Sequence, residues 1–451
     1  MTTLSRPTTT SDLGASQREV AEAVDHARRA TTAWRHTAPA ERAAALRNAA
    51  DLVRDHADEL GEELCATTGR LLRESRESAV VAASLLDEVA VTGLAGGRSL
   101  AGAAGSVDWV RREPRGVVGV LTPWNDPFPA AAGLLGAALV TGNTVVHKPS
   151  ERSMAPGLSL AHLIQECLPE GVLSSVAGDA EVGRAIVDTV DVVCHIGSSA
   201  AGREIRTVCA ARGAKALTEN GGKDALLVDA GVDPRWAAQQ IATGAFTNAG
   251  QLCTSVERVY LHEEVAEAVT RELVALAEAL RPGDPRDDST TLCRLVDEAQ
   301  LDVVAAHVAD AVERGARVRC GAKRLELDGA WWAPTVLDRC REDLDVMTEE
   351  TFGPVAALTT VRSWEDGLAQ ASVSRYGLAA TVLTPDTRHA LQAIEELPVG
   401  TVKVNAVFGG APGGSADPRG DSGAGRGYGP DLLDELVALK AVHWEPVPQS
   451  S

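Results

Sequence analysis

The chain has 451 residues, enough for two or three domains with sizeable hydrophobic cores. Its 45% hydrophobic and 24% charged residues are ordinary for a globular protein, and its net charge of −20 argues against general binding to nucleic acid or to an anionic membrane surface. No apolar run approaches the ~18–20 residues of a membrane span, and residues 1–12 lack the pattern of a secretory signal, so we expect a cytoplasmic protein.

The cysteines and histidines give no sign of a metal site. Eight cysteines are dispersed without a CxxC pair, and ten histidines are scattered without an HExxH-like arrangement. Neither a zinc site nor a compact disulfide framework fits that spacing. We therefore expect reduced thiols and no bound metal.

The first hundred residues predict helices. Ser16 and Glu19 form a capping-box pattern ahead of an apolar helical face. Apolar residues at helical spacing predict a second helix over residues 40–65 and a third over residues 74–94. We expect these helices to cover a sheet and to carry no chemistry.

From residue 99 onward, strand patterns alternate with helix patterns. Residues 106–112 alternate apolar with polar side chains, as an exposed antiparallel strand does. Strands are then predicted at 117–121, 144–147 and 190–196, with helices at 128–139, at 157–167 and after residue 197. This alternation predicts an α/β fold with a parallel sheet, whose ligands bind at the carboxyl ends of the strands.

Residues able to bind a ligand follow each of the three predicted strands: Trp124 and Asn125 after the first, Lys148 and Glu151 after the second, and Gly197 and Ser198 after the third. A carboxylate can bind ribose hydroxyls with a lysine supporting them, and a helix start favours a pyrophosphate. No GxGxxG fingerprint is present, and the second and third sets could be only a turn or a helix cap.

The second half resumes the α/β pattern. Helices are predicted at 234–246, 263–280 and 297–313, and strands at 225–228, 256–261, 355–361 and 401–405. Residues 409–429 are Gly-rich and predict an irregular loop. The last apolar stretch, 436–444, could begin as a helix and end as an extended strand.

Cys253 and Glu219 are the candidate reacting groups. Cys253 lies between a predicted helix and a predicted strand, close after Gly250, where a thiol is well sited to attack a bound carbonyl. The alternative is a small buried hydrophobic cysteine. A lone Glu such as Glu219, near a Gly-Gly turn, is usually solvated, but in a partly buried pocket its pKa could rise enough to activate water.

Together these segments resemble the NAD(P)-dependent aldehyde dehydrogenase superfamily along nearly the whole chain. The resemblance is specific because seven motifs follow one another in the family order: PWND at 123–126, KPSE at 148–151, GS at 197–198, ENGGK at 219–223, GQLC at 250–253, EETFGP at 349–354 and SGAGR at 422–426.

The resemblance implies a catalytic role for three residues. Cys253 would attack the aldehyde to give a thiohemiacetal, whose oxyanion the side-chain amide of Asn125 and the backbone N–H of Cys253 would hold. Collapse of that intermediate would pass a hydride to nicotinamide and leave a thioester. Glu219 would then activate the water that hydrolyses the thioester to the carboxylic acid.

The resemblance also implies how a dinucleotide would bind. Lys148 and Glu151 would hold the adenosine ribose, and Ser198 a phosphate oxygen. Glu350 would hold the nicotinamide ribose, with Phe352 near the ring, and Trp124 and Gly197 complete the predicted contacts. Because Glu151 would repel a 2′-phosphate, we expect NAD to be preferred, with NADP possible.

In terms of fold, the resemblance implies a Rossmann-type cofactor domain from residues 1–97 and 113–220 and an α/β catalytic domain from residues 221–425. Segments 98–112 and 435–447 would form a small oligomerisation sheet, so we expect a homodimer or homotetramer. Asp126 stands where many family members carry an aromatic residue, which suggests a polar or roomy substrate tunnel.

Two alternatives stay open. The first is transfer of the acyl group to coenzyme A, or the reverse reduction to an aldehyde, although a base positioned for water, such as Glu219, favours hydrolysis. The second is a catalytically idle structural homologue, which would be expected to lack Cys253, Asn125 or Glu219. All three residues are present.

Overall fold

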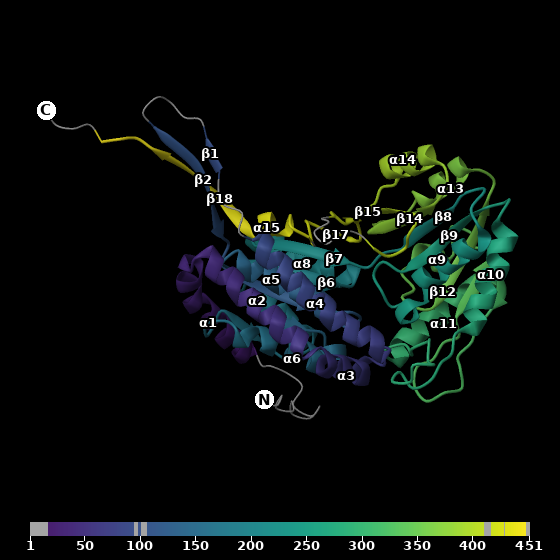
Figure 1. Ribbon diagram of the computed structural model, residues 1–451, viewed down its shortest axis with the longest axis horizontal. Coiled ribbons are helices and arrows are strands. Elements are labelled where there is room, and N and C mark those ends of the chain that lie inside the picture. The colour runs from purple at the N-terminus through teal and green to yellow at the C-terminus, as the bar shows by residue number, and fades with distance from the viewer. Residues whose placement is uncertain (1–16, 94–97, 101–105, 410–415, 428, 448–451) are drawn as a thin grey trace.

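The computed structural model describes residues 17–93, 98–100, 106–409, 416–427 and 429–447. These residues form two α/β lobes, each built on its own sheet, and an arm that projects away from both (Figure 1). The predicted capping residue Ser16 lies outside the described residues.

Of the N-terminal helices, α1 (Gln17–His36) packs directly on the first sheet, as predicted. The helices α2 (Pro39–Asp55), α3 (Ala57–Thr68) and α4 (Leu72–Thr92) instead pack on the helices that cover one face of that sheet. The single helix predicted over residues 40–65 is wrong, because the chain bends at His56 (φ −102°, ψ 14°) and separates α2 from α3. Buried Val53 and Leu60 keep helical spacing across this bend, so the apolar pattern alone could not reveal it.

The first sheet has six strands in the order β17-β7-β6-β3-β4-β5. The three strands predicted in this region are confirmed as parallel neighbours; the strands are β3 (Val117–Thr122), β4 (Thr144–Pro149), β5 (Leu173–Ser175), β6 (Val192–Gly197), β7 (Lys215–Asn220) and β17 (Gly423–Ala424). The helices between them are α5 (Pro127–Val140), α6 (Met154–Glu166), α7 (Ala180–Val187) and α8 (Ser199–Arg212). The side chains of Val118 and Val120 pack in the hydrophobic core on one face of the sheet, and that of Val117 packs in the core on the other face. Helices therefore cover both faces of the sheet.

The second sheet has seven strands in the order β10-β11-β12-β9-β8-β14-β15. They are β8 (Asp224–Val228), β9 (Val256–His262), β10 (Arg317–Cys320), β11 (Thr335–Asp338), β12 (Val355–Val361), β14 (Ala379–Leu383) and β15 (Thr401–Val404). Its helices are α9 (Pro234–Phe246), α10 (Ala266–Ala279), α11 (Glu298–Glu313), α12 (Asp345–Thr348), α13 (Trp364–Ala371) and α14 (Thr387–Glu396). The sequence analysis did not predict the strands β10, β11 and β14 or the helices α12, α13 and α14. All of these elements are short.

The Gly-rich stretch 409–429 is not wholly irregular, and the prediction is wrong in part. Strand β16 (Arg419–Gly420) pairs with β13 (Tyr376–Gly377), and β17 pairs with β7 so that Gly423 lies opposite Glu219. These strands are two residues long, which is too short for an alternation of side chains that would predict them. Residues 410–415 and 428 lie outside the described residues.

The arm is a three-stranded antiparallel sheet of β1 (Arg98–Leu100), β2 (Val107–Pro114) and β18 (Val437–Trp444). The extended end predicted for 436–444 is confirmed, and the short helix α15 (Leu432–Glu435) precedes it. Leu439 and Trp444 each expose 65% of their surface on this arm. Its predicted role in oligomerisation stays a prediction. None of the helices within the described ranges is long and apolar enough to cross a membrane.

Candidate active site

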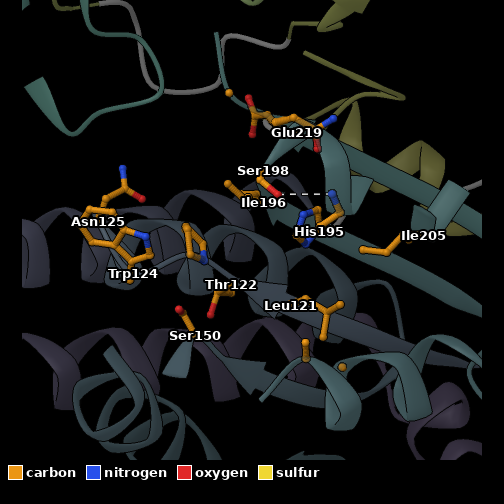
Figure 2. A pocket seen from close by; sticks show the side chains of 18 of the residues that line it. Leu121, Thr122, Trp124, Asn125, Ser150, His195, Ile196, Ser198, Ile205 and Glu219 are labelled. Atoms are coloured by element: carbon orange, nitrogen blue, oxygen red, sulfur yellow. Dashed lines mark hydrogen bonds between the residues drawn. The ribbon is translucent and has the colours of Figure 1, made fainter. Parts of the chain in front are cut away.

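One cleft of about 830 Å³ gathers all ten residues that the sequence singled out. The candidate catalytic residues Asn125, Glu219 and Cys253 line it, together with the candidate cofactor residues Trp124, Lys148, Glu151, Gly197, Ser198, Glu350 and Phe352. Figure 2 shows Trp124 and Asn125 on one side, with His195 on the neighbouring strand β6, Ser198 directly after that strand, and Glu219 beyond them. The cleft therefore joins groups far apart in the chain.

A tight left-handed turn presents Cys253. Asn248, Ala249 and Gly250 follow α9 with φ values of 48°, 54° and 72°. The side chain of Gln251 holds this turn, since its Nε2 donates to Asn248 O (2.9 Å) and its Oε1 accepts from Val296 N (2.9 Å). Two consecutive non-glycine residues with positive φ are strained, and the surrounding contacts hold them there.

Gly250→Ala is expected to destabilise the fold by about 3–5 kcal/mol. A Cβ at Gly250 would lie only 2.1 Å from Gly353 O, in addition to the cost of its φ of +72°. Gly213→Ala is the matched control, because Gly213 has a φ of +71° and nothing within 4 Å of the added Cβ. Thermal or denaturant unfolding should show a loss of about 1–2 kcal/mol for the control. Equal losses for both variants would contradict the close contact.

The thiol of Cys253 is protonated at neutral pH in this environment. Burial raises its pKa, and the nearby carboxylates of Glu219, Asp224 and Glu350 raise it further. A nucleophilic attack by this sulfur therefore needs a base or a local positive charge to remove the proton.

Glu219 lies on β7, although the sequence analysis assigned no strand there. Burial raises its pKa to about 7, the range in which a carboxylate can activate water at neutral pH. Gly427 packs against this side chain, where a Cβ would lie 3.3 Å from Glu219 Oε2. The backbone immediately after the SGAGR segment, at Gly427, thus forms one wall around the carboxyl group.

A hydrogen bond to the segment of the nucleophile holds the side chain of Asn125. It is 8% exposed, and its Nδ2 donates one hydrogen bond to Gln251 O at 3.0 Å, close before Cys253. Nδ2 carries a second hydrogen for a ligand oxygen. Within the part of the chain that the structure describes, no residue accepts a hydrogen bond from the Cys253 amide. Asn125 Nδ2 and the Cys253 amide therefore each have a hydrogen that can be donated to a ligand.

The glycine pair of the ENGGK motif allows the close approach of Glu350 and Cys253. A Cβ at Gly221 would lie 2.1 Å from Glu350 Oε2, and a Cβ at Gly222 would lie 2.8 Å from Cys253 O. The amide of Gly222 donates to Glu350 Oε1 at 3.1 Å. Burial is the main cause that raises the pKa of Glu350 to about 8.

A buried ion pair that the sequence analysis missed holds the loop of Glu350. The Glu257 carboxylate accepts from the amides of Thr351 (2.8 Å) and Phe352 (2.9 Å) and pairs with the Lys223 ammonium. Glu257 and Lys223 are 4% and 2% exposed. Two charged residues, Glu257 and Arg258, inside an otherwise apolar strand were the available signal, because buried charges require partners.

The other end of the cleft fits a dinucleotide. Ser198 caps α8, as predicted, with its Oγ accepting from Ala201 N at 3.3 Å (Figure 2), so a helix N-terminus opens on the cleft. Lys148 is buried in the cleft, and the carboxylate of the more exposed Glu151 lies 3.8 Å from the Lys148 ammonium. A pyrophosphate-binding helix end and a carboxylate for ribose hydroxyls suit a dinucleotide.

Two further features of this end were not predicted. In the sheet, Leu121 of β3 lies between His195 of β6 and Lys148 of β4. Burial lowers the pKa of His195 to about 4. Trp124 and Phe352 form an edge-to-face pair with ring centroids 5.6 Å apart. In the described residues, no group of three or more His, Cys, Asp or Glu side chains could hold a metal ion.

Comparison with known proteins gives consistent matches along the chain. The profile of the aldehyde dehydrogenase family matches residues 7–442. A putative succinate-semialdehyde dehydrogenase [NADP(+)] of Mycobacterium ulcerans is 33% identical over 445 residues, covering 95% of this chain and 84% of the relative.

Solved structures match in the same way. The NAD-dependent aldehyde dehydrogenase of Sinorhizobium meliloti is 31% identical with a TM-score of 0.93, over 97% of this chain and 90% of that one. The betaine aldehyde dehydrogenase of Staphylococcus aureus, solved in complex with NAD+, is 25% identical with a TM-score of 0.93, over 97% and 89% of the two chains.

Proposed function

The chain belongs to the aldehyde dehydrogenase family of oxidoreductases, and on this premise we propose that it oxidises an aldehyde to the carboxylic acid with NAD as hydride acceptor. The observation that carries the proposal is the convergence of Cys253, Asn125 and Glu219 on one cleft with the candidate cofactor residues. A thiol, an amide donor and a carboxyl of raised pKa are the groups that this reaction needs.

In the first step Cys253 Sγ bonds to the aldehyde carbon, and the carbonyl oxygen becomes an oxyanion. Asn125 Nδ2 and the Cys253 amide donate hydrogen bonds to that oxygen, an interaction whose loss costs about a hundredfold or more in rate. The thiol proton passes to solvent water as the carbon–sulfur bond forms, so Glu219 is not consumed in this step. The product is a thiohemiacetal on Cys253.

In the second step the thiohemiacetal becomes a thioester on Cys253. When bound, the dinucleotide supplies the acceptor for the hydride that leaves the substrate carbon. Glu219 then removes a proton from water as the water attacks the thioester carbon. The carbon–sulfur bond breaks, the carboxylic acid leaves, and the sulfur of Cys253 is restored.

We assign the dinucleotide to the unit of residues 1–97 and 113–220, which holds every strand of the first sheet except β17, and the nucleophile to residues 221–425. Lys148 and Glu151 would hold the adenosine ribose, the capped start of α8 at Ser198 the pyrophosphate, and Glu350 the nicotinamide ribose. The edge-to-face pair of Trp124 and Phe352 supports the position of the nicotinamide.

Glu151→Gln is expected to shift cofactor preference from NAD toward NADP by about threefold to fivefold, since an exposed charge interaction is worth at most about 1 kcal/mol. The variant removes the carboxylate that repels a 2′-phosphate and leaves Lys148 in place, 3.8 Å from the substituted group. The ratio of kcat/KM values for the two cofactors measures the shift. Glu170→Gln, an exposed change outside the cleft, should leave the ratio unchanged.

The test of the function is a panel of aliphatic, aromatic and semialdehyde substrates, each with NAD and with NADP. A semialdehyde is included because the Mycobacterium ulcerans relative carries that name. We expect one reduced cofactor for each carboxylic acid formed, without coenzyme A. A requirement for coenzyme A would favour acyl transfer, and absence of cofactor reduction with every substrate would favour an idle homologue.

A further inference from the structure

Arg70 holds the peptide of the candidate oxyanion residue. It lies between α3 and α4 and is 9% exposed. A single nitrogen, Nη1, donates to Asn125 O at 3.2 Å and to Asp126 Oδ1 at 2.6 Å. The two acceptors belong to adjacent residues, so one guanidinium nitrogen fixes the position of the segment 125–126.

Asp126 is oriented for Arg70 rather than for its own helix. It occupies the N-cap position of α5, where Asp commonly accepts from the second or third backbone amide of the helix, yet its side chain makes no capping hydrogen bond. Pro127 and Pro129 remove two of the amides at this helix start. The carboxylate instead accepts from Ser78 Oγ at 2.5 Å, on the same Oδ1 that Arg70 contacts.

The side chain of Asn125 is held separately. Its Nδ2 donates to Gln251 O, and Asn248 Nδ2 lies 3.4 Å from Asn125 O and 3.3 Å from Gln251 O. The turn before the nucleophile therefore holds the side-chain amide of Asn125 and also contacts its backbone carbonyl, to which Arg70 donates the shorter hydrogen bond. A residue held at both its side chain and its backbone has little freedom to move away from a developing oxyanion.

The positive charge of Arg70 persists despite its burial. Burial disfavours the charged guanidinium, but the carboxylates of Asp126 and Glu74 outweigh this effect and raise the pKa of Arg70. The charged guanidinium therefore stays paired with Asp126 while its Nη1 donates to Asn125 O.

We propose that Arg70 is a positioning residue that sets the Asn125 amide for the oxyanion, with Asp126 as its counter-ion. This inference rests on the proposed role of Cys253 and Asn125 in acyl chemistry. It also gives Asp126 a task other than substrate contact, since Asp126 Oδ1 is engaged by both Arg70 and Ser78.

The experiment measures acylation of Cys253 by p-nitrophenyl acetate, which needs neither cofactor nor aldehyde. The sulfur bonds to the acetyl carbon, and p-nitrophenolate leaves with the electron pair and is counted by absorbance. Arg70→Met should slow the acylation rate constant by about ten- to a hundredfold while the Kd for NAD stays unchanged. Arg70→Lys should recover most of the rate, because a single nitrogen makes both hydrogen bonds.

Arg73→Met is the matched control. Arg73 lies three residues further along the chain, on the first turn of α4, and its Nη1 donates to Thr290 O at 2.9 Å. Its acylation rate should equal that of the wild type. Should Arg70→Met fail to fold, Asp126→Ala removes the same ion pair from the other side and should give a loss of the same order.

A double variant separates positioning from a general loss of structure. If Arg70 acts through Asn125, then Arg70→Met should add almost nothing to the loss caused by Asn125→Ala. Fully multiplicative losses, or wild-type acylation rates in both Arg70→Met and Asp126→Ala, would overturn the proposal. A wild-type enzyme that reacts with the ester but oxidises no aldehyde would contradict the proposed function and leave the role of Arg70 standing.

Discussion

Cys253→Ser should abolish aldehyde oxidation, with kcat lowered by about 10⁴-fold or more, the scale seen when a nucleophile is removed. A serine hydroxyl is a much weaker nucleophile than a thiolate, and the nearby carboxylates of Glu219, Asp224 and Glu350, which already raise the pKa of the thiol, oppose ionisation of the hydroxyl as well. Steady-state formation of reduced cofactor over the aldehyde panel measures the loss.

Cofactor binding should survive in Cys253→Ser, because the side chains that would hold the dinucleotide remain in place. Titration calorimetry with NAD should give a Kd within about twofold of the wild-type value. Cys167→Ser is the matched control, since Cys167 is half-buried like Cys253 but lies outside the cleft, and it should keep full activity. Full turnover by Cys253→Ser would refute the proposed mechanism.

Glu219→Gln should stall the enzyme at the thioester, with hydrolysis slowed by about 10²–10⁴-fold. The amide cannot accept a proton from water, whereas formation of the thioester depends mainly on Cys253 and Asn125. A rapid burst of reduced cofactor, followed by slow turnover, should therefore appear in rapid-mixing experiments. Mass spectrometry of the intact protein should show the acyl group on Cys253.

The pH dependence of thioester hydrolysis gives a second test of Glu219 as the base. Only the ionised carboxylate is a base, and burial raises the pKa of Glu219 to about 7. Thioester hydrolysis in the wild type should therefore increase as pH rises through about 7 and level off above it. The Glu219→Gln variant should lack this inflection.

Glu204→Gln is the control for that pH profile. Glu204 also lines the cleft, but its side chain is 55% exposed and paired with Arg184 at 3.0 Å. The inflection near pH 7 should persist in this variant. If it disappeared there, or if Glu219→Gln hydrolysed the thioester at the wild-type rate, another group would have to be the base.

Local patterns predicted much of the fold and the identities of the candidate site residues. Short apolar runs located β3, β4 and β6, and Asn125, Lys148 and Ser198 lie at or after their carboxyl ends. Strand β14 was missed although it lies inside the second sheet, between β8 and β15, because its short apolar run has no distinctive period.

What the sequence by itself determined was chemical type and order: a thiol, an amide, a carboxylate and a helix start, each beside a local turn or strand signal. Only the tertiary structure decided that Glu219 is buried enough for its pKa to reach about 7, that Arg70 holds Asn125, and that Glu257 holds the loop of Phe352. The reason is physical. Turn and periodicity signals depend on neighbours within a few residues, whereas desolvation and hydrogen bonds between distant residues depend on how complete elements pack.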